Sequence, residues 1–300
     1  MSIPQMGIFS LGDPSHSFIE FALRGGVSAG DAVKAVSGLH DPRKTIEGVN
    51  LVAGFRPELW RAAASTDAPA DAASFERALI GPDGYTIPAT QEDVFIWIAG
   101  AAYDNVFDVA CSIIEKIGPV ATPVRELTGW TYQHNRDLTG FQDGTENPTL
   151  EDAPGIALID DGQPGAGGSI LLFQQWKHEA EAWRALAIGA QELVVGRTKP
   201  ESVELDETHM PADSHVTRTT LDEDGEELKI FRRNTPYGDV ADHGTVFVGF
   251  SKQQHRLQRM LERMAGIPDG VRDALTRYST PLTGAYYFVP ALSSLARFAT

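Results

Sequence analysis

Hydrophobic residues in the first half of this chain recur in patterns that are typical of strands. Residues 17–23 alternate with period two, and residues 49–55 form a second apolar run. Residues 93–100 are almost continuously apolar, which predicts a central strand that is buried on both faces. We also predict an entry strand at 7–10 and a strand over 124–134 that leads toward the middle of the chain.

Other segments of the first half repeat their apolar residues every three or four positions, as one face of a helix does. This spacing predicts helices over 29–39, 56–64 and 103–117. The last of these helices should end at Gly118-Pro119, because proline cannot continue a helix.

The second half shows the same alternation of strand and helix patterns. Strands are predicted over 168–176, 228–238, 245–250 and 285–289, and helices over 177–190 and 251–264. Strand–helix–strand order on each side of Pro148 favours two packed α+β domains, residues 1–148 and 149–300. The alternating strands favour mostly antiparallel sheets.

The composition is that of an ordinary globular chain, with 42% hydrophobic and 22% charged residues among 300. A net charge of −16 argues against nucleic acid and anionic membranes as partners, because phosphate contacts need a basic surface. No run of about 20 apolar residues could span a membrane. Residues 1–10 lack the basic and apolar segments of a secretory signal, so we expect a cytoplasmic protein.

Cysteine and histidine spacing limits the kinds of metal site. The single cysteine, Cys111, excludes an intramolecular disulfide and any multi-cysteine zinc or iron–sulfur site. The eight histidines form no His-x-His or His-Glu-x-x-His pattern, so a metal site built from protein ligands alone is poorly supported.

The midpoint of the chain combines glycines, an aspartate and a turn signal in the run Gly140-Phe141-Gln142-Asp143-Gly144-Thr145-Glu146-Asn147-Pro148. Glycine allows a left-handed backbone or a close approach to a flat ligand, and Asn-Pro favours a turn. The pattern predicts a tight loop with few bulky side chains, which holds Asp143 toward a bound group that occupies the space beside it. The alternative is an Asx-type turn that only joins the two domains.

Strand periodicity in residues 228–238 puts a guanidinium and an amide on an otherwise apolar face. That face carries Leu228, Ile230, Arg232 and Asn234. It suits a pocket with an apolar wall and a polar end, and a buried Arg232 calls for an anionic partner. The alternative is an edge strand with a solvated basic end.

His215 and Asp273 are candidates for a metal ligand and its partner. His215 lies among polar residues outside any apolar pattern. Imidazole is a common ligand of iron and needs a partner on its other ring nitrogen, a role for which Asp273 is a candidate. The alternatives are a surface or turn histidine and a carboxylate on a helix surface or in a first helical turn.

Together these segments resemble the dye-decolourising peroxidase family of haem proteins, and most closely its bacterial B-type branch. The matching segments occur in the family's order: the 140–148 loop (the family's GxxDG signature), Val195-Gly196-Arg197-Thr198-Lys199, Ser214-His215-Val216-Thr217-Arg218, Arg232 with Asn234, and residues 281–290. A lone motif match is weak, whereas an ordered set of matches is specific.

The resemblance implies an α+β fold of two ferredoxin-like domains with antiparallel sheets, of the dimeric α+β barrel type. It also implies haem b, held largely by the C-terminal half, with His215 as the proximal iron ligand and Asp273 as the acceptor of its ring N–H. Asp269 lies close to Asp273 in the sequence. The other residues that the resemblance places at the haem are Asp143, Arg232 and Asn234 on the distal side, Arg197 as a candidate partner for a propionate, and Gly144 and Thr145.

The implied activity is that of a haem peroxidase that reduces hydrogen peroxide and oxidises dyes, phenols and similar one-electron donors through a ferryl intermediate. A distal carboxylate can move the peroxide proton from one oxygen to the other, and a fixed guanidinium stabilises charge as the O–O bond breaks. The alternative is a haem-handling protein for storage, delivery or iron release. A third reading is a non-haem ferredoxin-like binding module.

The family resemblance also implies a homo-oligomer. Almost nothing follows the last predicted strand, so we expect no tail that targets the protein to an encapsulin shell. Bulky donors would need electron transfer at the haem edge or through aromatic residues. The candidate relays are Trp97, Trp130, Trp176, Trp183 and Tyr286, although we expect core packing for most of them.

Overall fold

Antiparallel strands from both halves of the chain form a closed barrel in the computed structural model, which describes residues 2–39, 48–223 and 225–299. The strands follow the order β11-β10-β6-β1-β5-β2-β13-β7, pairing between β7 and β11 closes the ring, and β12 extends β7. The first half supplies β1 (Ser15–Leu23), β2 (Val49–Phe55), β5 (Val94–Gly100) and β6 (Ala121–Trp130). The second half supplies β7 (Ser169–His178), β10 (Phe231–Gly238), β11 (His243–Ser251), β12 (Ser279–Pro281) and β13 (Ala285–Val289).

The two halves of the barrel meet through much shorter strand pairings than those within each half. In the described part of the chain, β10 and β6 pair at Tyr237 and Gly129, and β13 and β2 pair at Phe288 and Phe55. Neighbouring barrel strands within a half share registers of five to nine residue pairs. The barrel is therefore one antiparallel sheet in which two groups of strands, one from each half of the chain, meet at short junctions. The antiparallel sheet and the helices around it confirm the predicted α+β class.

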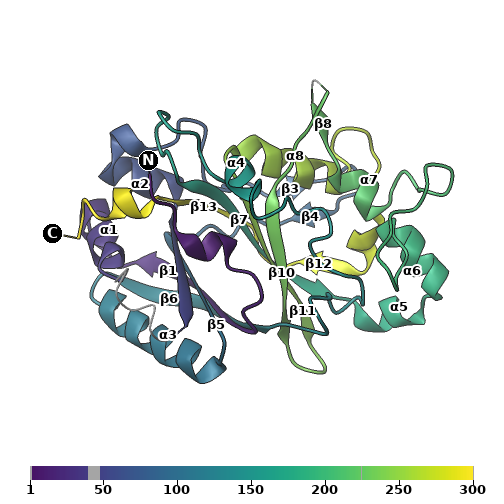
Figure 1. The fold of residues 1–300 in the computed structure, drawn as a ribbon, viewed down its shortest axis with the longest axis horizontal. Coiled ribbons are helices and arrows are strands. Elements are labelled where there is room, and N and C mark those ends of the chain that lie inside the picture. The colour runs from purple at the N-terminus through teal and green to yellow at the C-terminus, as the bar shows by residue number, and fades with distance from the viewer. Residues whose placement is uncertain (1, 40–47, 224, 300) are drawn as a thin grey trace.

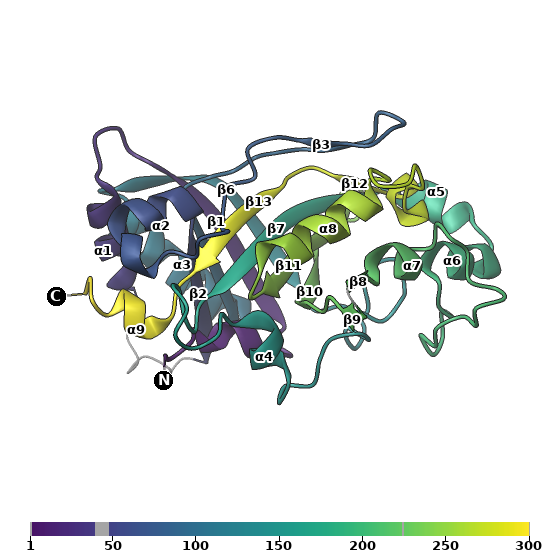
Figure 2. The same cartoon turned by 90° about the horizontal axis from the view of Figure 1, so that it is seen from above.

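Helices cover the outside of the sheets and gather toward opposite ends of the molecule (Figures 1 and 2). The end formed by the first half carries α1 (Ala29–Ser37), α2 (Pro57–Ala63), α3 (Tyr103–Ile117) and the C-terminal α9 (Leu292–Leu295). The other end carries α5 (Ala180–Ala185), α6 (Ile188–Val195) and α7 (His215–Thr219), while α8 (Gln254–Met264) runs beside β7 and β11. The shorter elements are α4 (Ala153–Ala157), the 3-10 helices η1 (Met6–Phe9), η3 (Ser65–Asp67) and η4 (Ala274–Arg277), and the strand pairs β3 (Leu79–Ile80) with β4 (Thr86–Ile87) and β8 (Asp222–Glu223) with β9 (Glu226–Glu227).

The alternation of side chains along the strands creates two hydrophobic cores. The core inside the barrel contains Phe95 and Trp97 of β5. The core between sheets and helices contains Ile96 and Ile98 of the same strand. Every residue of β5 is buried, which confirms the predicted central strand.

Several predicted elements need correction. Residues 7–10 contain the end of 3-10 helix η1 and not a strand. The strand predicted over 124–134 ends at Trp130, and Gln133 and His134 have positive φ values of 35° and 57°, which a strand cannot hold.

The helix predicted over 177–190 is confirmed only in part. Its first two residues end β7, and the helical residues belong to two separate helices, α5 and α6, the second of which continues to Val195. The break falls where Leu186 and Ala187 adopt extended backbone conformations, so that α6 starts in a new direction. The strand predicted from residue 228 begins at Phe231.

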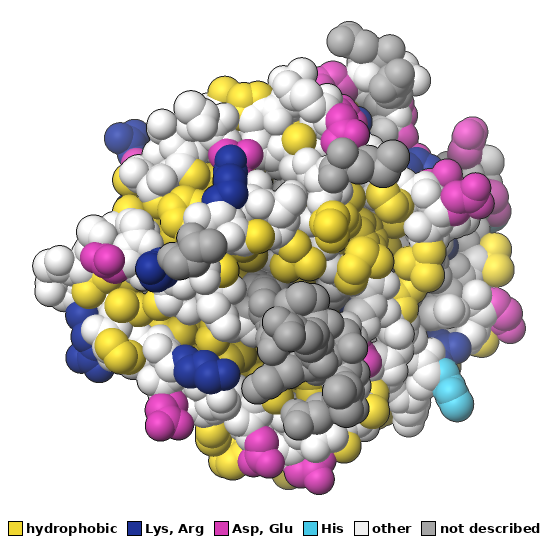
Figure 3. Space-filling model, turned by 60° about the vertical axis from the view of Figure 1, so that its left-hand side comes forward, with side chains coloured by type: hydrophobic (Ala, Val, Ile, Leu, Met, Phe, Trp, Pro, Cys, Tyr) yellow, Lys and Arg dark blue, Asp and Glu magenta, His cyan; other side chains and the backbone are white. Residues whose placement is uncertain are grey.

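Figure 3 shows the face at the α1 end of the molecule, where hydrophobic side chains gather between scattered side chains of both charges. Among the described residues, no helix is long and apolar enough to cross a membrane.

Candidate active site

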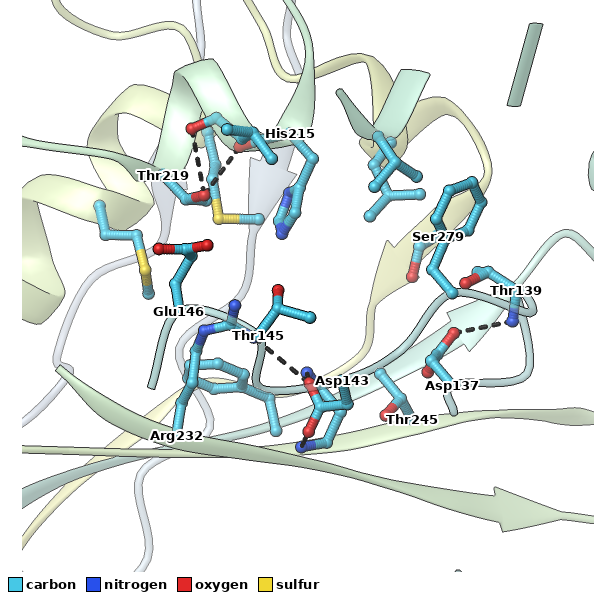
Figure 4. Close-up of a pocket in the computed structure, with 18 of the residues that line it drawn as sticks. Asp137, Thr139, Asp143, Thr145, Glu146, His215, Thr219, Arg232, Thr245 and Ser279 are labelled. Carbon is cyan, nitrogen blue, oxygen red and sulfur yellow. Dashed lines mark hydrogen bonds and ion pairs between the residues drawn. The ribbon is translucent and has the colours of Figure 1, made fainter. Parts of the chain in front are cut away.

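A large cavity lies beside the second-half sheet, next to β7, β10 and β11 (Figure 4). It encloses about 1450 Å³, including the part that is open to solvent. Its apolar wall includes Leu228, Ile230, Phe247, Met260 and Met264. Polar side chains from the 140–148 loop, α7 and β10 complete the lining and include most of the predicted site residues.

His215 is the first residue of α7, and its ring extends into the cavity (Figure 4). The preceding residue, Ser214, caps the helix because its side chain accepts a hydrogen bond from the backbone N–H of Thr217. The His215 Nδ1 atom lies 2.7 Å from Oδ2 of Asp273. A carboxylate only accepts, so Nδ1 carries the proton and Nε2 keeps a free lone pair for a metal.

Asp273 is fully buried and accepts a hydrogen bond at each carboxylate oxygen. One oxygen accepts from His215, and the other accepts from the backbone N–H of Leu275 at 2.9 Å, where Asp273 caps 3-10 helix η4. Asp269 is engaged elsewhere, because the guanidinium of Arg218 donates to both of its oxygens at 2.8 Å and thereby lowers the pKa of that carboxyl. The structure therefore brings Asp273, and not Asp269, to the histidine.

Asp143 lies on the opposite side of the cavity from His215, together with Arg232 (Figure 4). Its Oδ1 accepts from Asn234 Nδ2 at 2.6 Å and from Arg232 Nη1 at 3.3 Å. Its Oδ2 accepts from the backbone N–H of Asn234 at 3.0 Å. The Asp143 side chain is 9% exposed, so these donors supply most of its solvation.

The loop that holds Asp143 depends on the glycine after it. Gly144 has a φ of +72°, and a Cβ atom there would approach Nδ2 of Asn147 to 2.9 Å. Asn147 needs that place because its amide forms two hydrogen bonds with the backbone of Arg232, one to the carbonyl at 2.7 Å and one from the N–H at 3.0 Å. The pair of bonds fastens the loop to β10 and so aligns Asp143 with Arg232.

Sequence reasoning assigned Asn147 only a turn signal. Its amide is the signal that could have suggested this role. The amide N–H and the amide oxygen can pair with the carbonyl and the N–H of a strand, as the backbone of a neighbouring strand does. No local pattern, however, identifies a partner 85 residues away.

Arg197 is buried in the cavity wall, where carboxylates already surround it. Its Nη2 donates to Glu204 at 2.9 Å and to Glu146, and its Nη1 donates to the carbonyl of Ser202 at 2.8 Å. A haem propionate would have to share or replace these partners, so its assignment to Arg197 stays a prediction. Thr145 lines the cavity between the two sides of the site (Figure 4).

The lining fits the haem that the sequence resemblance implies. Apolar walls suit a flat porphyrin, and His215 presents a free ring nitrogen with its other nitrogen already fixed. The opposite side presents a carboxylate, a guanidinium and an amide from one strand and one loop. This arrangement can ligate an iron from one side and exchange protons with a small ligand on the other.

Comparisons with known proteins agree with this geometry. The family model "Dyp-type peroxidase, C-terminal" matches residues 134–294. A dye-decolorizing peroxidase of Mycolicibacterium paratuberculosis is 36% identical over 268 residues, which cover 88% of this chain and 74% of the relative.

Solved structures show the same similarity. A variant of Rhodococcus jostii RHA1 DypB in complex with heme superposes with a TM-score of 0.89 at 35% identity, over 95% of this chain and 96% of that one. A dye-decolorizing protein from Vibrio cholerae gives a TM-score of 0.89 at 34% identity, over 98% and 99% of the two chains.

Proposed function

Because this chain belongs to the Dyp-type peroxidase family and is a haem-dependent peroxidase with ferredoxin-like α+β architecture, we propose that Asp143 and Arg232 carry out its reaction with hydrogen peroxide. The observation that supports this assignment is their direct contact, 3.3 Å between Arg232 Nη1 and Asp143 Oδ1, across the cavity from the His215–Asp273 pair. A protein that only stores or delivers haem has no need of such a carboxylate and guanidinium.

Bound haem would supply an iron that accepts peroxide and stores its two oxidising equivalents. His215 would hold that iron through Nε2, while Asp273 keeps the Nδ1 proton and makes the imidazole a stronger donor. In this proposal His215 would bind the iron, Asp273 would fix the orientation of the His215 ring, and neither would move the peroxide protons.

Asp143 would take a proton from one peroxide oxygen and return it to the other, which leaves as water. Asn234 fixes the orientation of the carboxylate through two hydrogen bonds, so that the proton has a defined acceptor. Arg232 would stabilise the negative charge that develops on the departing oxygen. Complete reduction of one peroxide to two waters consumes two protons and two electrons, which two one-electron donors supply.

We further propose dyes and phenols as the donors, a homo-oligomeric state and a cytoplasmic location. Dyes as donors are supported by the names of the relatives, and phenols and the oligomer by the family resemblance in the sequence. We also propose domain limits of 1–148 and 149–300, which are supported by the single-pair junctions between the strands of the first half and those of the second. Gly144, Thr145 and Arg197 are proposed to lie against the haem, because Thr145 and Arg197 line the cavity and Gly144 shapes the loop.

Absorption spectra of haem-loaded protein before and after one equivalent of hydrogen peroxide test the assignment. We expect His215→Ala to abolish the histidine-ligated spectrum. We expect Asp143→Ala to keep that spectrum but to respond slowly to peroxide. Haem binding without any response to peroxide in the wild type would favour the haem-handling alternative, and no haem binding would exclude both functions.

A further inference from the structure

A continuous column of aromatic rings fills the interior of the barrel. Trp97 stacks on Phe18 with ring centroids 5.7 Å apart, and Phe18 contacts Phe173 at 6.0 Å. Phe173 contacts Phe95 at 4.7 Å, and Phe95 stacks on Tyr287 at 5.3 Å. All five residues are buried, and we call them the aromatic column.

The aromatic column lies directly behind the wall of the haem cavity. In β7, Gln174 and Trp176 line the cavity, whereas Phe173, the residue before Gln174, points to the other face of the strand and belongs to the column. In β10, Arg232 lines the cavity, whereas Arg233 lies over Trp97. One layer of strands therefore separates the column from the site of the peroxide reaction.

Tyr287 ends the column with its hydroxyl on a carboxylate. The hydroxyl donates to Glu20 Oε1 at 2.5 Å, and Glu20 is 1% exposed. The second oxygen of Glu20 accepts from Arg125, whose side chain is 25% exposed. Oxidation of a buried phenol is easiest when its proton has a base at hydrogen-bond distance, because no unpaired positive charge then remains on the ring.

Trp97, at the other end, is less able to keep a positive charge. Its indole N–H donates to His16 Nδ1 at 3.2 Å, so His16 is its proton acceptor. The Arg233 guanidinium lies 5.2 Å from the Trp97 ring, and a protonated His16 would place a second cation beside it. Burial and the Arg233 guanidinium lower the pKa of His16 to about 4, because both disfavour the protonated imidazole.

We propose that Tyr287, with Glu20 as its proton acceptor, is a redox-active site that takes up one oxidising equivalent of hydrogen peroxide when no donor is present. The proposal rests on the haem peroxidase function. Tyr287 gives one electron through the column to the haem site and its phenolic proton to Glu20. The products are a neutral tyrosyl radical and a neutral carboxyl group on Glu20. Arg125 then no longer faces a carboxylate at Glu20, but its charge is partly solvated and lies near Glu92. An external donor then returns one electron, and the proton moves back from Glu20 to Tyr287.

The neighbouring tyrosine offers a matched control. Tyr286 and Tyr287 are adjacent on β13 and both are at most 1% exposed. The Tyr286 hydroxyl donates to Oε1 of Gln258 at 3.0 Å, a neutral amide that cannot take a proton. Sequence reasoning named Tyr286 as a candidate relay, whereas the structure favours Tyr287.

Electron paramagnetic resonance of haem-loaded protein frozen after one equivalent of hydrogen peroxide, without donor, tests the proposal. We expect a tyrosyl signal that narrows with ring-deuterated tyrosine, disappears in Tyr287→Phe and persists in Tyr286→Phe. Glu20→Gln keeps a hydrogen-bond acceptor but no base, and we expect it to lose the signal as well. A signal that survives Tyr287→Phe, or that Tyr286→Phe removes equally, would overturn the proposal.

Two further measurements keep the result interpretable. If Tyr287→Phe fails to bind haem, 3-fluorotyrosine can be placed at position 287, because it keeps the hydroxyl. Fluorine splitting of the radical signal would then identify Tyr287 as the radical site. A radical signal without fluorine splitting would count against Tyr287. The Soret band and the consumption of peroxide are recorded in parallel. Normal values of both with no Tyr287-dependent radical overturn this inference alone, whereas failure to bind haem or consume peroxide overturns the proposed function.

Discussion

The two faces of β10 place the same residue type in opposite settings. On the cavity face, Arg232 donates to the carboxylate of Asp143 and is held by Asn147 through its backbone. On the interior face, Arg233 lies 5.2 Å from the ring of Trp97 and donates to the backbone carbonyl of Ile8. Burial lowers the pKa of Arg233 to about 10, although Asp13 and Asp143 oppose this effect. Adjacent arginines thus have different surroundings: Arg232 contacts a carboxylate beside the cavity, and Arg233 packs against the aromatic core.

The sharpest test of the cavity face is Asp143→Asn. The amide keeps one oxygen that can accept from Asn234, and the Asn147 bonds still hold the loop to β10, but the amide cannot take the peroxide proton. Loss of a general base typically costs about 10²–10⁴-fold in rate. We expect a fall of this size in the rate constant for peroxide, measured by stopped-flow absorption, with haem affinity unchanged. A rate near that of the wild type would leave Arg232 as the dominant group.

The same substitution at the two arginines compares the two faces directly. Arg232→Met should lower the rate constant for peroxide by about 10²–10³-fold, because it removes a fixed donor to developing charge. Arg233→Met should leave that rate close to the wild-type value, since methionine keeps apolar contact with Trp97 and Phe231. Both variants are followed by stopped-flow with their unfolding curves as the control. Equal losses of rate would mean that the distinction between the faces is wrong.

Asn147→Ala tests whether the cavity face depends on the loop clamp. The change removes two hydrogen bonds to the Arg232 backbone, each worth about 1 kcal/mol. We expect the free energy of unfolding, measured in denaturant, to fall by about 2 kcal/mol, and the peroxide rate to fall as Asp143 loses its alignment. Unchanged kinetics together with reduced stability would assign Asn147 a purely structural role.

The sequence predicted the division between the faces of β10, because period-two alternation is local and separates Arg232 and Asn234 from Arg233. The motif order likewise pointed to Asp143, His215 and Arg232, and the structure brings all three to one cavity. The clamp by Asn147 and the carboxylates around Arg197 were not predictable. They depend on which distant segments fold against one another, and no periodicity encodes that choice.

The smallest expected effect lies on the interior face, at His16, which is 5% exposed and faces Arg233 and Asp13. Its pKa falls from 6.5 to about 4 on folding, so the unfolded chain binds its proton first. A depressed pKa gives stability that is complete above pH 6.5 and is lost as pH falls toward 4. Between pH 7.5 and 5.5 the loss is about 1 kcal/mol.

His16→Gln should remove this dependence, since glutamine does not titrate and its carbonyl oxygen can still accept from the Trp97 indole. Denaturant unfolding of the haem-loaded protein at the two pH values should show a stability loss that is about 1 kcal/mol smaller in the variant. Peroxide kinetics at pH 7.5 should match the wild type, because His16 belongs to β1 and is not among the residues that line the cavity. An identical acid loss in both proteins would mean that burial and the Arg233 guanidinium do not lower the pKa of His16 in the folded protein.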